Sequence, residues 1–90
     1  MVLLISYDLN GHERPSAYAT IAKIIRDNAE DVRKPLYSQW FVKTSLTPSQ
    51  WVELLKSAFD ADDKAFILQV KHPYDGWQEK EFYAWLEANI

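Results

Sequence analysis

The hydrophobic pattern starts with a short continuous apolar run, because residues 2–5 read Val-Leu-Leu-Ile and are followed by a polar exit that contains Asp8 and Asn10. A run of this length, bounded by turn-forming residues, is typical of a strand that is buried on both faces. We therefore predict a buried strand over residues 2–7, with Asp8 at the point where the strand leaves the core.

Two later segments carry apolar residues at helical spacing. The first opens at Pro15 or Ser16, which suit the first turn of a helix. Its apolar stripe consists of Tyr18, Ile21, Ala22, Ile25 and Ala29. The second has a full start signal, with Thr47 as the N-cap, Pro48 at the first helical position and Gln50 closing a capping box. Both patterns predict amphipathic helices, and we expect the second to end near residue 60.

Three further segments predict strands. Residues 31–34 leave room only for a short strand, and because Pro35 cannot donate to a ladder, this strand should lie at a sheet edge. Residues 38–44 alternate in character and carry an aromatic residue on each face, so neither face should be fully exposed. Residues 65–70 form another nearly continuous apolar run, which indicates a second central strand.

The order of these elements predicts an α+β fold, the ferredoxin-like βαββαβ arrangement with a four-stranded antiparallel sheet and both helices on one face. A last helix over residues 78–88 is added at the C-terminus. We expect a single domain over residues 1–90, with its core at 1–71 and a C-terminal helical tail at 72–90. The first and fourth strands are interpreted as central. The open face should then be covered by the C-terminal helix, by a second copy of the chain, or by both.

Composition narrows the function classes. The chain has no cysteine, which excludes disulfides, thiolate metal sites and thiol nucleophiles. Its N-terminal apolar run is too short for a signal peptide or a membrane span, so we expect a cytoplasmic protein with no membrane partner. The net charge of −3 argues against a strong nonspecific grip on nucleic acid. Aromatic residues reach 14%, which is more large, flat side-chain surface than one small domain hides easily, and this suggests a partner subunit.

Asp8 is the candidate catalytic and metal-binding residue. A carboxylate at the end of a buried strand is held rigidly but can still meet a ligand. One carboxylate is too few for Mg²⁺ or Mn²⁺, but a two-fold axis beside the first strand would pair two Asp8 side chains. Asn10, His12 or Arg14 would then steer a substrate. The alternative is that Asp8 only caps the following loop, as such residues commonly do.

A second candidate site is a small basic edge on the predicted edge strand. Arg33, Lys34 and Lys43 would contact nucleic acid there, and Tyr37 could stack on a base. The alternative is that these cations only keep the edge strand soluble. Residues 60–64 are acidic but lack the glycine and distal glutamate of a calcium loop, so we interpret them as a solvated turn. His72 lies beside a proline and is interpreted as a loop residue and not as a ligand.

Several short motifs resemble the small CRISPR adaptation subunit. These are Ile-Ser-Tyr-Asp-Leu at residues 5–9, Ser-Gln-Trp-Phe-Val-Lys-Thr at 38–44, and Leu-Thr-Pro-Ser-Gln at 46–50. The resemblance extends through the strand at 65–68 and covers roughly the first seventy residues. The chain looks closer still to the stand-alone relatives labelled as the "SinR family", which share a Ser-Tyr-Asp-Leu-Asn start and a Trp-rich tail. Virulence-associated protein D is a more distant member of the same superfamily.

The resemblance implies a homodimer packed through the open faces of two sheets. It also implies either a metal-dependent nuclease, whose metal-binding aspartate maps onto Asp8, or a non-catalytic scaffold on duplex nucleic acid. This chain departs from the family in its acidic charge, in a helical tail where the family often has a strand, and in a loop that has only Arg14 where the family has several arginines.

Three functions therefore stay open at this point: a divalent-metal-dependent endonuclease, a nucleic-acid-binding module, and a catalytically inactive adaptor or scaffold that binds another protein in a defence, phage or toxin–antitoxin setting. The acidic balance and the surplus of Trp and Tyr favour the adaptor. Whether the chain is an enzyme depends on Asp8.

Overall fold

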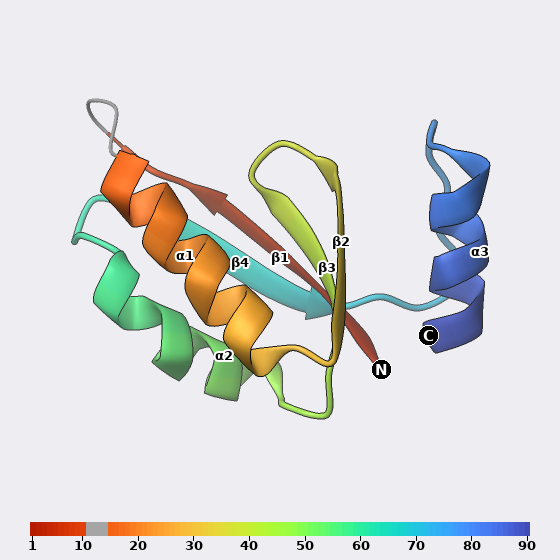
Figure 1. Cartoon of the computed structure of the whole chain (residues 1–90), viewed down its shortest axis with the longest axis horizontal. Helices are drawn as coiled ribbons and strands as arrows, with labels where there is room; N and C mark the ends of the chain where they lie inside the picture. Colours follow the sequence, from red (N-terminus) through yellow and green to blue (C-terminus); the bar gives the residue numbers. More distant parts are fainter. Residues whose placement is uncertain (11–14) are drawn as a thin grey trace.

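The computed structural model describes residues 1–10 and 15–90, and in these ranges the chain forms one sheet and three α-helices (Figure 1). In chain order the elements are β1 (Val2–Asp8), α1 (Pro15–Asn28), β2 (Asp31–Leu36), β3 (Gln39–Lys43), α2 (Pro48–Leu55), a short 3-10 helix η1 (Lys56–Ala58), β4 (Lys64–Gln69) and α3 (Lys80–Asn89). The strands are antiparallel and lie in the order β2-β3-β1-β4. This confirms the predicted ferredoxin-like α+β fold with an added C-terminal helix.

The prediction that the fourth strand is central is wrong, because β4 lies at a sheet edge. β1 pairs with both β3 and β4, so the central strands are β1 and β3. β4 is mostly exposed. On one face its Ile67 packs on the core beneath the helices, while Phe66 and Leu68 point to the other face and stay exposed. The apolar run therefore reflects a strand with one uncovered apolar face.

β2 is the other edge strand, as predicted, but it extends two residues beyond the predicted end at Lys34. Pro35 lies inside it, and the pairing with β3 is irregular between Arg33 and Leu36. A proline that cannot donate to the ladder is tolerated at such an edge position. The turn to β3 follows at Tyr37 and Ser38.

α1 and α2 cover one face of the sheet and enclose the main core. Its fully or almost fully buried members are Leu3, Ile5, Tyr7, Ile21, Ile25, Trp40, Val42, Trp51, Leu55 and Ala58. The predicted capping box is present, since the backbone N–H of Gln50 donates to Thr47 Oγ1 at 3.2 Å and that of Thr47 donates to Gln50 Oε1 at 2.8 Å. The α-helix ends at Leu55, earlier than the predicted end near residue 60, and continues as η1.

α3 covers part of the opposite face, at the end where β1 begins and β4 ends (Figure 1). Five buried residues form this second core: Val2, Val70, Phe82, Trp85 and Leu86. Phe41 of β3 packs against it, with its ring centroid 4.8 Å from that of Phe82. The aromatic residue on each face of β3 is thus explained by two separate cores.

The segment before α3 is tied to the helix through Glu87. Tyr74 Oη donates to Glu87 Oε1 at 2.6 Å, which raises the pKa of Tyr74 to about 12 and lowers that of Glu87. His72 Nε2 lies 3.1 Å from Glu87 Oε2, and the His72 ring stacks on Tyr74.

No helix in the described ranges is long and apolar enough to cross a membrane.

Replacing Trp85 by Ala should lower the free energy of unfolding by about 3–5 kcal/mol, because truncating a buried tryptophan leaves a cavity in the second core. Trp77 is the matched control, since its side chain is fully exposed at 100%. Trp77→Ala should leave the urea midpoint unchanged. Equal midpoints for the two variants would show that α3 contributes nothing to the stability of the domain.

Candidate functional site

Asp8 is the last residue of β1 and its side chain is exposed on the sheet face opposite α1 and α2. Antiparallel pairing places Lys64 of β4 directly across from Asp8, and Phe66 across from Ser6. Paired residues share a face, so these four side chains lie together beyond the part that α3 covers. A shallow hollow of about 210 Å³ lies at this end of the two strands.

The described residues supply one carboxylate to this end of the face. Nowhere in residues 1–10 and 15–90 do three Asp, Glu or His side chains gather closely enough to hold a metal ion. A single Asp8 fits Mg²⁺ or Mn²⁺ only as one of one or two carboxylate ligands, with water filling the other positions. Within the described residues, Asp8 alone therefore offers at most one carboxylate ligand at this end of the face.

The acidic turn after α2 anchors the exit from β1. Asp63 Oδ1 accepts a hydrogen bond from the backbone N–H of Asn10 at 2.9 Å, and its Oδ2 accepts one from the N–H of Asp60 at 2.8 Å. This carboxylate closes its own turn and fixes Asn10 two residues beyond Asp8. The predicted substrate contacts His12 and Arg14 lie outside the described residues.

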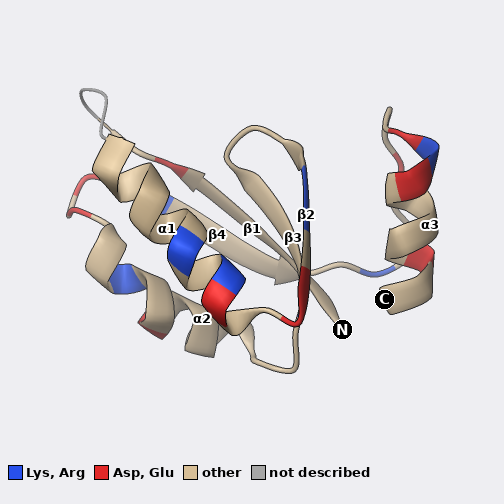
Figure 2. Cartoon of the chain, viewed as in Figure 1, with Lys and Arg blue, Asp and Glu red and all other residues tan. Residues whose placement is uncertain are grey.

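The predicted basic edge is divided between the two faces of the sheet. Lys and Arg residues are spread over several elements and do not gather along one edge (Figure 2). Arg33 shares a face with Phe41, its partner across the ladder, and so points toward α3. Lys43 lies on that face too, opposite Asp31. Lys34 points to the helix side, where its ammonium lies over the Trp40 ring.

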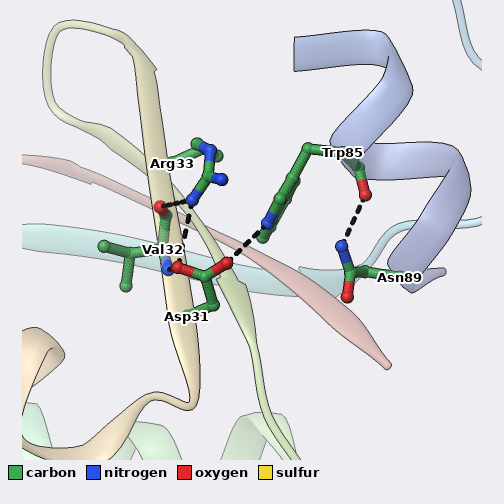
Figure 3. A network of polar contacts seen from close by, with 5 residues as sticks. All are labelled: Asp31, Val32, Arg33, Trp85 and Asn89. Atoms are coloured by element: carbon green, nitrogen blue, oxygen red, sulfur yellow. Dashed lines mark hydrogen bonds and ion pairs between the residues drawn. The ribbon is translucent and has the colours of Figure 1, made fainter. Parts of the chain in front are cut away.

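Arg33 takes part in a network that joins β2 to α3 (Figure 3). Its Nη1 donates to Asp31 Oδ1 at 3.0 Å and to the carbonyl oxygen of Val32 at 2.7 Å, and its guanidinium lies 5.0 Å from the ring centroid of Trp85. Trp85 Nε1 donates to Asp31 Oδ2 at 2.9 Å. The indole N–H is the main cause that holds the pKa of Asp31 below its ordinary value of 3.8. In this position Arg33 helps to hold α3 in place.

Lys34 and Tyr37 do come together, at a pocket between α1 and the β2–β3 turn. We call this the tyrosine pocket; it is lined by Tyr7, Tyr18, Ala19, Ala22, Lys34, Tyr37, Ser38 and Trp40 and holds about 300 Å³. The sequence analysis assigned Tyr18 to the apolar stripe of the first helix, Trp40 to one face of the alternating strand at 38–44, and Tyr7 to the buried first strand. The sequence signal that could have predicted the pocket is the placement of these aromatic residues, since the predicted fold brings all of them to the same end of the core between the helices and the sheet.

Comparison of the sequence with protein-family models and with curated proteins finds no match. The resemblance to the CRISPR adaptation subunit therefore remains a prediction.

Asp31 should make stability depend on pH on the acid side. A carboxyl whose pKa is lowered by folding stabilises the native state above its ordinary value of 3.8, and this contribution is lost as the pH falls through the lower native pKa. Asp31→Asn removes the charge, and Trp85→Phe removes the indole donor. Both should flatten the loss of stability below pH 3.8, measured as urea midpoints across an acid titration. Two profiles as steep as that of the wild type would contradict this assignment.

Proposed function

We propose that the protein acts on nucleic acid as a homodimer, with the Asp8 carboxylates of two copies as its divalent-metal site. The observation that carries the proposal is that Asp8 lies on the same sheet face as the largest exposed apolar side chains of the strands.

The uncovered part of the sheet face has the character of an interface. Phe66 is 70% exposed and Leu68 40% on β4, and Leu36 is 46% exposed on β2. Between them lie Ser6 and Gln39, whose side chains are joined by a hydrogen bond from Gln39 Nε2 to Ser6 Oγ at 3.3 Å. Burying such a face against a second copy removes apolar area from water, and each Å² buried stabilises the complex by about 25 cal/mol. α3 already covers the other end, so association through the Asp8 end completes the covering.

A two-fold axis near Asp8 would supply the second carboxylate. In an interface of this kind the same surface is used by both copies, so a residue near the axis meets its own symmetry mate. Two carboxylates at short range repel each other unless a cation lies between them. A divalent ion held there would lower the pKa of a bound water and stabilise charge on a phosphodiester. Asp8 would hold the ion, and Lys64 opposite it would attract the phosphate backbone.

The second candidate is a catalytically inactive adaptor that binds another protein through the same face. Two observations favour this candidate: Phe66 and Leu68 are exposed, and the chain has a net charge of −3. An exposed apolar face on an acidic protein is better suited to bind another protein than to bind nucleic acid. Both candidate functions use the apolar face as an interface. They differ in whether Asp8 binds a metal ion.

Phe66→Glu should convert a dimer into a monomer, because two like charges would be buried in the interface. Sedimentation at micromolar concentration should give twice the chain mass for the wild type and the single-chain mass for Phe66→Glu. Trp77→Glu, which changes an even more exposed aromatic residue outside the sheet, should remain dimeric. A monomeric wild type would remove the second carboxylate and with it the proposed metal site.

Asp8→Asn should remove the metal response and leave the fold intact, because the amide has the same size but no charge. Mg²⁺ or Mn²⁺ should raise the melting temperature of the wild type by mass action, and this rise should vanish in the variant. Cleavage of a labelled oligonucleotide should vanish with it. Asp62→Asn, an exposed aspartate in the turn before β4, is the matched control and should keep both responses.

A dimer that shows neither a metal-dependent shift nor cleavage would overturn the metal site and favour the adaptor. In that case Asp8→Asn should also be silent, since asparagine caps a loop as well as aspartate does.

A further inference from the structure

We infer that the tyrosine pocket binds a single unpaired nucleobase together with its attached phosphate. The pocket lies on the helix side of the sheet, whereas Asp8 and the proposed interface lie on the other face. The inference rests on the proposed function only in assigning the base to a nucleic acid, because a free nucleotide presents the same chemistry.

The pocket combines a fixed floor with an open aromatic wall. Tyr7 and Trp40 form the floor; both are buried, and Trp40 Nε1 donates to Tyr7 Oη at 3.1 Å. Tyr37 is 84% exposed and forms the outer wall. Tyr18 lies between them, with its ring centroid 6.3 Å from that of Tyr7 and 6.5 Å from that of Tyr37. A ligand that enters is therefore bordered by aromatic rings on more than one side.

The turn that carries Tyr37 is joined to β1 by a backbone hydrogen bond. Ser38 has a φ of 59°, in the left-handed region that few residues other than glycine adopt without cost. Its carbonyl oxygen accepts the backbone N–H of Tyr7 at 3.3 Å, which ties the turn to β1. This contact places the turn, and with it the backbone of Tyr37, beside the end of β1 that carries Tyr7.

One cation, Lys34, lines the pocket, and a second, Arg26, lies over the Trp40 ring nearby. Lys34 Nζ lies 5.0 Å from the ring centroid of Tyr37 and 5.6 Å from that of Trp40, and the guanidinium of Arg26 lies 5.1 Å from the same Trp40 ring. Within the described part of the chain, no ion pair joins either cation to a carboxylate. Two unpaired cations repel a cationic ligand, which aromatic pockets otherwise bind well. The pocket therefore favours a ligand that is both planar and anionic.

Size and chemistry together indicate one nucleotide. Ligand pockets usually measure roughly 300–1,000 Å³, so a volume of about 300 Å³ suits one planar ring system. Proteins that bind single strands stack bases on aromatic side chains and hold the backbone with cations. Here Tyr37 would stack on the base and Lys34 would bind the phosphate. A base held within a duplex cannot enter, because both of its faces are already stacked.

The test is a titration of the wild-type protein with a fluorescently labelled single-stranded hexanucleotide, with AMP, and with adenosine or inorganic phosphate alone. We expect AMP to bind at least tenfold more tightly than adenosine or phosphate, since only AMP engages both Tyr37 and Lys34. Similar affinity per site for AMP and the hexanucleotide would assign the pocket to free nucleotides. Clearly tighter binding of the hexanucleotide would assign it to single-stranded nucleic acid.

Variants locate the binding. Lys34→Ala and Tyr37→Ala should each weaken binding at least tenfold. Tyr37→Phe keeps the aromatic ring and should bind with the affinity of the wild type. Both side chains are exposed, so the melting temperatures should stay near that of the wild type. Lys80→Ala changes an exposed lysine on α3 and is the matched control. Absence of binding, equal binding of a blunt duplex, or full affinity in both alanine variants would overturn the inference.

The same titration on Asp8→Asn separates this inference from the proposed function. Unchanged binding in Asp8→Asn is expected, because Asp8 points to the opposite face. If the tyrosine pocket fails to bind while the Asp8-dependent metal response persists, the inference is wrong and the proposed function stands.

Discussion

The burial of β1 from two sides is the constraint on which the rest of the structure depends. Leu3 and Ile5 pack beneath α1 and α2, while Val2 and Leu4 pack toward α3. A strand that alternates between two cores is fixed in register, because a shift by one residue would exchange both sets. α3 reaches only the first part of the strand. The other end at Asp8 therefore stays exposed on a rigid support, which is why candidate chemistry concentrates there.

The attachment of α3 also decides which cations remain available. Trp85 donates to Asp31 and lies under the guanidinium of Arg33, so the start of β2 is committed to holding the helix. Lys34, the next residue, points to the other face, as alternation along a strand requires. Its charge is left at the tyrosine pocket, among rings and without a carboxylate in the described residues. A single edge strand thus places one cation against α3 and the next one at the tyrosine pocket.

Local signals in the sequence predicted the helices, the strands and the fold well. They predicted less well which side chains lie next to one another in the folded chain. The capping box at Thr47, the edge strand and the two-sided β1 all follow from rules that involve a few adjacent residues. The position of β4 was predicted wrongly because an apolar run looks the same in sequence whether its second face is covered by the protein or left exposed, as at Phe66. The basic edge was grouped by closeness in sequence, although alternation already assigns Arg33 and Lys34 to opposite faces. The tyrosine pocket joins β1, α1 and β3, and no local pattern reports such a meeting.

The two candidate sites meet at one peptide of β1, because Tyr7 forms the floor of the tyrosine pocket and Asp8 lies on the opposite face. A dimer formed through the uncovered face would leave both tyrosine pockets on its outer surfaces, so the two functions need not compete for space. They lie on opposite faces of the sheet, so a nucleic acid that reached both would have to pass around the sheet. A single strand can bend sharply enough to do this, whereas duplex DNA has a persistence length of about 50 nm and cannot bend around so small a domain. If the two sites act on one molecule, that molecule is single-stranded.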